Sequence, residues 1–359
     1  MATSTFSAAP TTTSHRSSEC TTAVPGRHGH VSDFEACNAY YNFDPEFAPA
    51  VAVAVIFGLF TLCHAVLAFT YNKRYAWVLI MGALWETLAF ILHALGSLNQ
   101  QNLGYASGHA IFYLLAPLWI NAFVYMTVAR MIHFFVPEQK IGGIRSTSLS
   151  KIFVAADIVT FLVQAAGGSM ASPGAESSTI KTGLTVYMVG MGIQEACILA
   201  FVFLMVLFHR RVVRLDTEGE RWNGAVEPGA SKSMSVRGWG MSLFALYGVL
   251  GVITIRIIFR IAEFANGVIP ANPIPFHEVY SYVLDAFPMM LALLLLTIWH
   301  PGRVLQGPGS DFKEVRSARR EAKRAKKEER VAVKQQKKVA KAEKRNGTTY
   351  LLGASLWPN

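Results

Sequence analysis

Charged side chains recur at helical spacing inside very apolar parts of the chain. Arg256, Arg260 and Glu263 are separated by four and three residues, so they share one face of a helix. The same spacing recurs downstream in a second set, formed by Glu278, Tyr282 and Asp285. A charge at mid-membrane costs about 2.5–3.5 kcal/mol on insertion scales, so such residues normally face a protein interior or a polar path. These two sets are therefore candidates for a functional site.

The two sets are predicted to meet, because they fall on consecutive antiparallel helices joined by a short Pro-containing loop. At about 1.5 Å per residue, Arg256 and Asp285 each lie about 10 Å inward from the connected ends of these helices. The equal depth predicts a buried Arg256–Asp285 ion pair, with Arg260 near Tyr282 or Glu278. Two compatible interpretations stay open, namely a salt bridge that fixes helix packing and a polar receptor for a lipid headgroup.

Other polar residues also fall inside apolar stretches. Asp157, Gln164 and Gly168 follow at intervals of seven and four, on one helix face. Glu86 and His93 are seven residues apart and share a face of another helix. The remaining candidates are Gln194 and Glu195, which follow Gly190 and Gly192, and His64. Close helix packing with interhelical hydrogen bonds and the lining of a cavity both account for such residues.

The elements that carry these residues are long apolar helices. Hydrophobic residues make up 52% of the chain and charged residues 16%, against about 25% charged in soluble domains. A bilayer core of about 30 Å needs about 20 apolar residues in a helix. Seven stretches qualify, at about 48–70, 76–97, 109–130, 152–171, 182–208, 239–262 and 279–300. We expect an all-α polytopic membrane protein, since a soluble enzyme, a disulfide-rich secreted domain and a disordered scaffold fit this composition poorly.

Basic residues set the expected orientation. Of 33 Lys and Arg, 28 fall in the loops after spans one, three and five or after Pro301, and three lie on the opposite side. The positive-inside rule then places the N-terminus outside and the C-terminus in the cytoplasm. We divide the chain into an external, largely disordered N-tail (1–47), a seven-helix membrane domain (48–300) and a basic cytoplasmic tail (301–359) that is helical over about 311–345.

The two tails suggest further expectations. Clustered Lys and Arg after the last span attract anionic lipids of the inner leaflet by about 1 kcal/mol per charge, although a solvated stalk has the same composition. The tail has no aromatic residues between 313 and 349, so a nucleic-acid partner is not expected. Cys20 and Cys37 both fall in the external tail, where a disulfide is chemically allowed. Cys63 and Cys197 lie inside spans, as small apolar residues.

Several chemistries lack their signature. The chain has no Gly-rich phosphate loop and no Lys in the seventh span that could carry a retinal Schiff base. A membrane zinc hydrolase would require clustered His ligands, but His64, His93 and His109 fall on three different helices. We therefore expect no cofactor, no metal and no catalytic residues.

Several short motifs follow one another in a fixed order. They are Tyr41-Asn-Phe-Asp-Pro45, Leu115-Ala116-Pro117, Gln164-Ala-Ala-Gly167-Gly168, Arg256-Ile-Ile-Phe-Arg260-Ile-Ala-Glu263, Glu278-x-x-x-Tyr282-x-x-Asp285 and His300-Pro301-Gly302. In this order they resemble the fungal lipid-translocating exporters, the resistance-to-aminocholesterol-like family, over about three quarters of the chain. In the second span, family members usually have Glu-x-x-Gly-Tyr-x-x-Arg. Here the corresponding run ends in His93, which replaces a permanent cation by a titratable group.

The resemblance implies a transporter that translocates or exports amphipathic lipids, such as sphingoid long-chain bases or sterol-like toxic amphipaths, and contributes to resistance. It implies membrane lipids as partners and the plasma membrane as location, with the endoplasmic reticulum or vacuole as alternatives. A cationic long-chain base would favour Asp157, Glu195 or Asp285, whereas a phosphorylated lipid would favour Arg256 and Arg260. A seven-span lipid or stress sensor with cytoplasmic partners stays open as an alternative, and a lipid-modifying metalloenzyme as a lesser one.

Overall fold

A computed structural model describes residues 21–34, 36–217 and 232–305, together with positions 312, 317, 320, 321, 324, 325 and 328. The chain divides into two compact units, Met1–Gln306 and Gly307–Asn359. In the second unit, the described residues between 317 and 328 are helical. The rest of the helix predicted over 311–345 lies outside the described residues, as does Cys20.

Among the described residues, seven helices of the first unit are long and apolar enough to cross a membrane, which confirms the predicted number. The elements are α1 (Phe47–Thr70), α2 (Trp77–Leu98), α3 (Leu103–Phe135), α4 (Ser146–Met170), α5 (Ser177–Thr217), α6 (Lys232–Ala265), α7 (Glu278–Ser281) and α8 (Phe287–Ile298). A π-helical turn, Tyr282–Ala286, joins α7 to α8 within the seventh span. The third and fifth helices run well beyond the predicted spans, and α3 continues through Pro117 without interruption.

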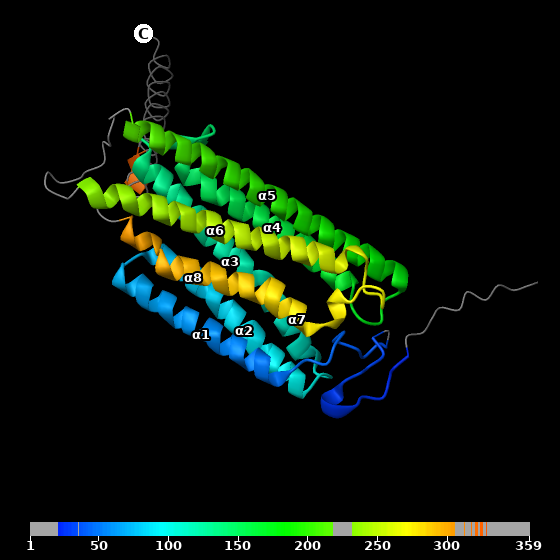
Figure 1. Cartoon of the computed structure of the whole chain (residues 1–359). Coiled ribbons are helices and arrows are strands. Elements are labelled where there is room, and N and C mark those ends of the chain that lie inside the picture. Colours follow the sequence, from blue (N-terminus) through cyan, green and yellow to red (C-terminus); the bar gives the residue numbers. More distant parts are fainter. Residues whose placement is uncertain are drawn as a thin grey trace, which may run out of the picture. The chain divides into compact units, whose positions relative to one another are not determined.

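The helices form a closed bundle in which each packs against its neighbours in sequence, and α8 packs against α1 (Figure 1). Helix α3 also contacts α5 and α6. In its most apolar stretch of 18 residues, 61% of the residues are buried within the protein, against 28% in the corresponding stretch of α1. The N-terminal segment, defined here as the described residues before α1 (21–34 and 36–46), lies at the end of the bundle where α7 begins (Figure 1). We call this the α7 end, and the end where α8 finishes the α8 end.

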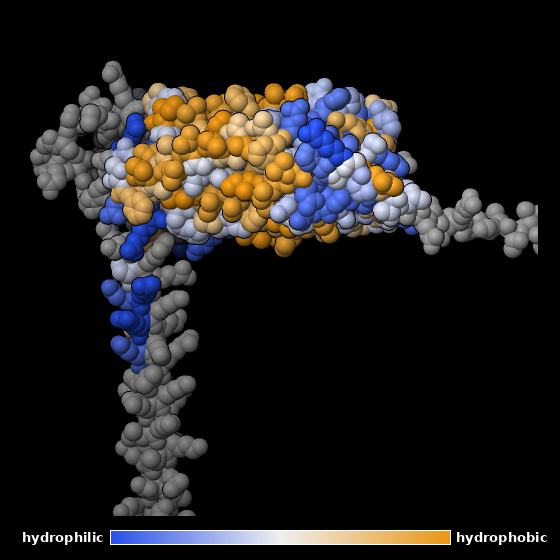
Figure 2. All heavy atoms as spheres, turned by 90° about the horizontal axis from the view of Figure 1, so that it is seen from below, coloured by the Kyte–Doolittle hydropathy of each residue, from blue (hydrophilic) through white to orange (hydrophobic). Residues whose placement is uncertain are grey.

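Large apolar side chains cover the middle of the bundle. Leu62 and Val66 on α1 and Phe203 on α5 are more than 60% exposed. Figure 2 shows one face of the molecule, with hydrophobic residues over the middle of the bundle and hydrophilic residues gathered toward its ends. An exposed apolar surface of this kind marks a region that contacts a membrane or another protein. Together with the seven apolar helices it identifies the chain as a multi-pass membrane protein.

A short β-hairpin at the α8 end was not predicted from the sequence. Its strands are β1 (Lys140–Ile141) and β2 (Ile144–Arg145), paired antiparallel between α3 and α4. Just before it, Glu138 forms an ion pair with Arg211 of α5. Hydrogen bonds from its own backbone and from Arg211 lower the pKa of Glu138. The pair ties the α3–α4 connection to α5.

Glycines bring α4 and α5 into close contact. A Cβ at Gly167 would lie 2.5 Å from the Tyr187 backbone nitrogen, and one at Gly183 would lie 2.7 Å from the Gly167 carbonyl oxygen. The prediction that Gly168 shares the packed face is wrong, since Gly168 is exposed and a Cβ there would touch nothing. The 3.6-residue period turns Gly167, one residue earlier, toward α5.

The cysteines differ in state between the two regions. Cys37 in the N-terminal segment is disulfide-bonded. Cys63 in α1 and Cys197 in α5 are free thiols within the spans.

Candidate functional site

An inner charge cluster, defined here as Arg256, Arg260, Glu263 and Asp285, lies between α6 and the seventh span. Asp285 is fully buried and pairs through Oδ1 with Arg256 Nε and through Oδ2 with Arg260 Nε. Arg260 Nη1 also donates to Glu263 Oε2 at 2.9 Å. The predicted Arg256–Asp285 pair is confirmed. The ion partners of Arg260, however, are Asp285 and Glu263, because Arg256 and Arg260 are one turn apart and Asp285 offers each an oxygen.

Tyr113 of α3 forms one wall of the inner cluster. The two guanidinium carbons of Arg256 and Arg260 lie 5.4 and 5.2 Å from the centre of its ring. The Tyr113 carbonyl accepts a weak hydrogen bond from Arg256 Nη2 at 3.4 Å. Cations near an aromatic face are stabilised by the ring quadrupole, more so where water is excluded. Tyr113 therefore helps to hold both arginines on the inside of the bundle.

The π-helical turn positions Asp285. Pro288 follows it closely and has no backbone N–H, so the Leu284 carbonyl cannot receive the usual helical bond from residue 288. The Phe287 N–H instead donates to the Tyr282 carbonyl, which widens the helix by one residue. Such turns inside α-helices occur frequently at functional sites.

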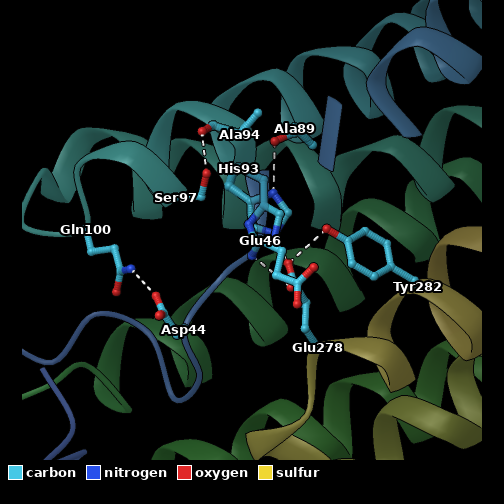
Figure 3. A network of polar contacts seen from close by, with 10 residues as sticks. Asp44, Glu46, Ala89, His93, Ala94, Ser97, Gln100, Glu278 and Tyr282 are labelled. Atoms are coloured by element: carbon cyan, nitrogen blue, oxygen red, sulfur yellow. Dashed lines mark hydrogen bonds and ion pairs between the residues drawn. The ribbon is translucent and has the colours of Figure 1, made fainter. Parts of the chain in front are cut away.

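An outer latch, defined as Glu46, His93, Glu278 and Tyr282, joins three chain segments at the α7 end (Figure 3). His93 Nε2 donates to Glu278 Oε1 at 2.8 Å, and the Tyr282 hydroxyl donates to the same oxygen at 2.8 Å. The Glu46 N–H donates to Glu278 Oε2 at 3.0 Å. Because a carboxylate only accepts, the His93 proton is assigned to Nε2 from this network. Glu278 thus ties the start of α1 and the end of α2 to α7.

The N-terminal segment adds further contacts beside the latch. Gln100 Nε2 donates to Asp44 Oδ1 at 2.6 Å, and Gln100 Oε1 lies 2.9 Å from His30 Nδ1. The ring of Tyr41 packs directly against Gly96, where a Cβ would strike the hydroxyl. Burial raises the pKa of Tyr41 to about 12. This segment is therefore packed onto the end of α2.

An aromatic layer separates the outer latch from the inner cluster. Phe90 lies three residues before His93 and four after Glu86 on the same face of α2. The ring stacks on Phe57 of α1 at 5.6 Å and meets Tyr113 of α3 edge-on at 5.5 Å. The other members of this layer are His109, which donates to the Ala89 carbonyl at 2.9 Å, and Tyr282. These rings lie between the polar groups of the latch and those of the inner cluster.

Glu86 of α2 is fully buried on the inner side of the aromatic layer. It interacts electrostatically with Arg256, Asp285 and Arg260. Neither carboxylate oxygen has a hydrogen-bond partner among the described residues. Glu86 therefore differs from Glu278, Glu263 and Asp285, all of which are paired.

The remaining predicted residues do not join this site. Asp157 of α4 is buried near Tyr125 and Asn121 of α3, away from the inner charge cluster. Gln164 Nε2 donates to Gln194 Oε1 at 2.7 Å, across the α4–α5 contact.

Two more predicted residues likewise form interhelical bonds elsewhere. Glu195 Oε1 accepts from the Thr254 hydroxyl at 2.9 Å, which links α5 to α6. His64 Nε2 lies 3.3 Å from the Thr297 hydroxyl, toward the α8 end of α1 and α8. We assign these residues, with Gln164 and Gln194, to helix packing.

Sequence reasoning missed the neutral and aromatic parts of the site. Tyr113, Phe90 and the Glu46 N–H were not predicted as members, because single aromatic residues and backbone groups carry no spacing signal. Phe90 could have been found from its place midway between Glu86 and His93 on one face. Among the described residues, no group of three His, Cys, Asp or Glu side chains converges as a metal site.

A protein-family model described as "RTA1 like protein" matches residues 79–308, which include all of the inner charge cluster. Among curated proteins, the "Probable lipid transporter atnI" of Emericella nidulans is 39% identical over 297 residues, which cover 82% of this chain and 76% of that protein. No solved structure gives a significant match.

Two more distant relatives also carry transport names. The "Sphingoid long-chain base transporter RSB1" of Saccharomyces cerevisiae is 26% identical over 282 residues, or 72% of each chain. The "Lipid-translocating exporter-like protein RTA1" of Leptosphaeria maculans is 24% identical, over 77% of this chain and 54% of its own length.

Proposed function

Because the chain belongs to the RTA1-like family, we propose that it is a membrane transporter that translocates or exports amphipathic lipids, with sphingoid long-chain bases as the leading class. In this role it contributes to resistance against toxic amphipaths. The relatives named for lipid transport support the function, and the site inside the bundle supports the mechanism.

The observation that carries the proposal is a set of buried charges within a bundle whose outer surface is apolar. Asp285 and Glu86 are fully buried, and Arg256 is 4% exposed. An amphipath needs a polar environment for its headgroup and an apolar one for its chain. The inner charge cluster provides the first, and the aromatic layer and the surrounding bilayer provide the second. Charges inside a membrane span typically mark such substrate or ion pathways.

The proposed orientation places the outer latch on the external side and the α8 end in the cytoplasm. The distribution of Lys and Arg along the sequence supports this, with 28 of 33 in the connections after spans one, three and five or after Pro301. The basic residues after Pro301 would then lie near anionic lipids of the inner leaflet. The plasma membrane is the proposed location, and transport without catalytic activity is the proposed mode, as the names of the relatives suggest.

The test is leaflet exchange in liposomes that contain the purified full-length chain. A fluorescent long-chain base and a fluorescent phospholipid are placed in the outer leaflet, and the protected fraction is followed with a membrane-impermeant quencher. We expect the protein to accelerate movement of the long-chain base over protein-free liposomes. A folded protein that accelerates neither lipid would contradict the proposed function.

A further inference from the structure

We propose that Glu86 is an exchange site at which a proton and the ammonium group of a lipid or other amphiphilic amine replace one another. This inference rests on the proposed transport function and specifies its substrate charge and its coupling ion.

The inner charge cluster is electrically balanced without Glu86. Arg256 and Arg260 contribute two positive charges, and their ion partners Asp285 and Glu263 contribute two negative charges. These four residues therefore balance. Glu86 faces the same cluster but finds no hydrogen-bond donor among the described residues. A phosphate would meet two arginines that are already paired, whereas a cation would meet an unmatched carboxylate.

Burial makes an isolated charge on Glu86 unfavourable. An ionised carboxylate taken out of water without a partner is strongly unfavourable, so such a group binds a proton or pairs with a cation. Glu86 is fully buried, and one helical turn away Phe90 closes the side toward the latch. In the absence of a ligand, the proton is the cation that fits without any change in packing. A ligand ammonium would supply the same single charge, and its N–H groups would bond the two free oxygens.

Glu86 lies at about the same depth in the bundle as Asp285. His93 and Glu278 are in contact, and Glu86 and Asp285 each lie seven residues further in from their partner in that contact. At about 1.5 Å per residue, both carboxyl groups are about 10 Å inward from the latch. A headgroup that replaced the proton on Glu86 would thus lie at the level of Asp285, within the bundle.

The groups that surround Glu86 do not offer another exchange partner. Arg256, Arg260 and Asp285 interact electrostatically with Glu86, and so does Tyr113 of α3. The other titratable groups of the inner cluster and the aromatic layer are Glu263, His109 and Tyr282, and Tyr187 of α5 also interacts with the cluster. On α1 the titratable side chains are Cys63, which is exposed, and His64, which is bonded to Thr297. Among the described carboxyl groups that face this site, Glu86 is the one with neither a hydrogen bond nor an ion pair, since Asp285 and Glu263 are paired with the two arginines.

The exchange is balanced in atoms and charge. A protonated Glu86 carboxyl gives its proton to water as the ligand ammonium pairs with the carboxylate, and the reverse step returns the proton when the ligand leaves. No bond other than O–H is made or broken. Lower pH favours the protonated carboxyl and so weakens binding of the amine, by about tenfold per pH unit where one proton competes.

The test is proton release by the full-length chain in nanodiscs of neutral lipid, in weakly buffered solution with a pH indicator dye. The probe is dodecylammonium, whose amine resembles that of Lys and stays protonated near pH 7. We expect release of about one proton per bound dodecylammonium, no release with uncharged dodecanol, and none in empty nanodiscs. Glu86→Gln should abolish the release. Glu195→Gln should retain it, because Glu195 is a membrane carboxyl bonded to Thr254 outside this site.

A second measurement on the wild-type protein covers the case that Glu86→Gln does not fold. Difference infrared spectroscopy should show loss of a protonated carboxyl band when dodecylammonium is added. Absence of dodecylammonium binding, binding without proton release, or full release in Glu86→Gln would each overturn the exchange site. If liposomes move long-chain base but the binding experiment shows no proton release, the exchange fails and the proposed function stands. If no lipid moves but protons are released, the proposed function fails and the exchange site stands.

Discussion

His93 Nε2 and Glu278 Oε1 meet at 2.8 Å although 185 residues separate them in the sequence. This contact fixes the register of α2 against the seventh span. It places Phe90, and then Glu86 and Asp285, at successive depths below the latch. The order of polar, aromatic and charged layers therefore follows from this contact and from the residue spacing along α2 and the seventh span.

Glu278→Ala should loosen the N-terminal segment. The carboxylate accepts from His93, Tyr282 and the Glu46 N–H, so its removal leaves the Glu46 amide without its acceptor. We expect faster amide hydrogen exchange at the start of α1, with little change in the α4–α5 region. Glu176→Ala, at an exposed glutamate before α5, serves as control. Unchanged exchange in Glu278→Ala would contradict the latch.

Asp285→Asn should destabilise the fold more than Arg256→Met. Asp285 neutralises two arginines, whereas loss of Arg256 leaves Asp285 paired with Arg260. Breaking a buried ion pair costs about 3–5 kcal/mol. Thermal unfolding in detergent compares the two variants.

The double exchange Arg256→Asp with Asp285→Arg extends this comparison. It should fail to restore stability, because the new cation at position 285 would face Arg260. Full restoration would show that Arg260 takes no part in the cluster.

Phe90→Ala should lower stability through the cavity that it leaves. The Phe90 side chain is 3% exposed and packs against rings from α1, α3 and the seventh span. Large-to-small changes of this kind cost about 3–5 kcal/mol. Phe69→Ala, at a site on α1 that is 85% exposed, should change unfolding little. Equal effects of the two substitutions would argue against an aromatic layer.

Gly183→Ala should disturb the α4–α5 contact, because its new Cβ would lie 2.7 Å from the Gly167 carbonyl oxygen. Overpacking typically costs about 1–3 kcal/mol. Gly192→Ala on the same helix meets nothing within 4 Å and is the matched control. A thermal unfolding midpoint for Gly183→Ala equal to that of Gly192→Ala would contradict the close approach.

The apolar lengths and the helical spacings predicted the seven spans and the Arg256–Asp285 pair. These features depend on local composition and on the 3.6-residue period, which the sequence displays directly. Two packing details could not be predicted in this way. The choice of Gly167 over Gly168 depends on the rotation of α4 against α5, and the partners of Arg260 depend on the π-helical turn. Both are set by contacts between distant segments.

The membership of Glu86 in the site was predicted, but its lack of a partner was not. A free carboxylate is visible only once every neighbouring donor has been placed. The partner of His93 could not be predicted from the sequence either, because Glu278 lies at the other end of the membrane domain in sequence.

The most direct measurement is the rate of long-chain base exchange in liposomes with and without a pH gradient, for wild type, Glu86→Gln and Glu195→Gln. We expect wild type and Glu195→Gln to move the base at rates that the gradient changes, and Glu86→Gln to lose the response to the gradient. Exchange by the wild-type protein that is independent of the gradient, or a response that persists in folded Glu86→Gln, would contradict this expectation.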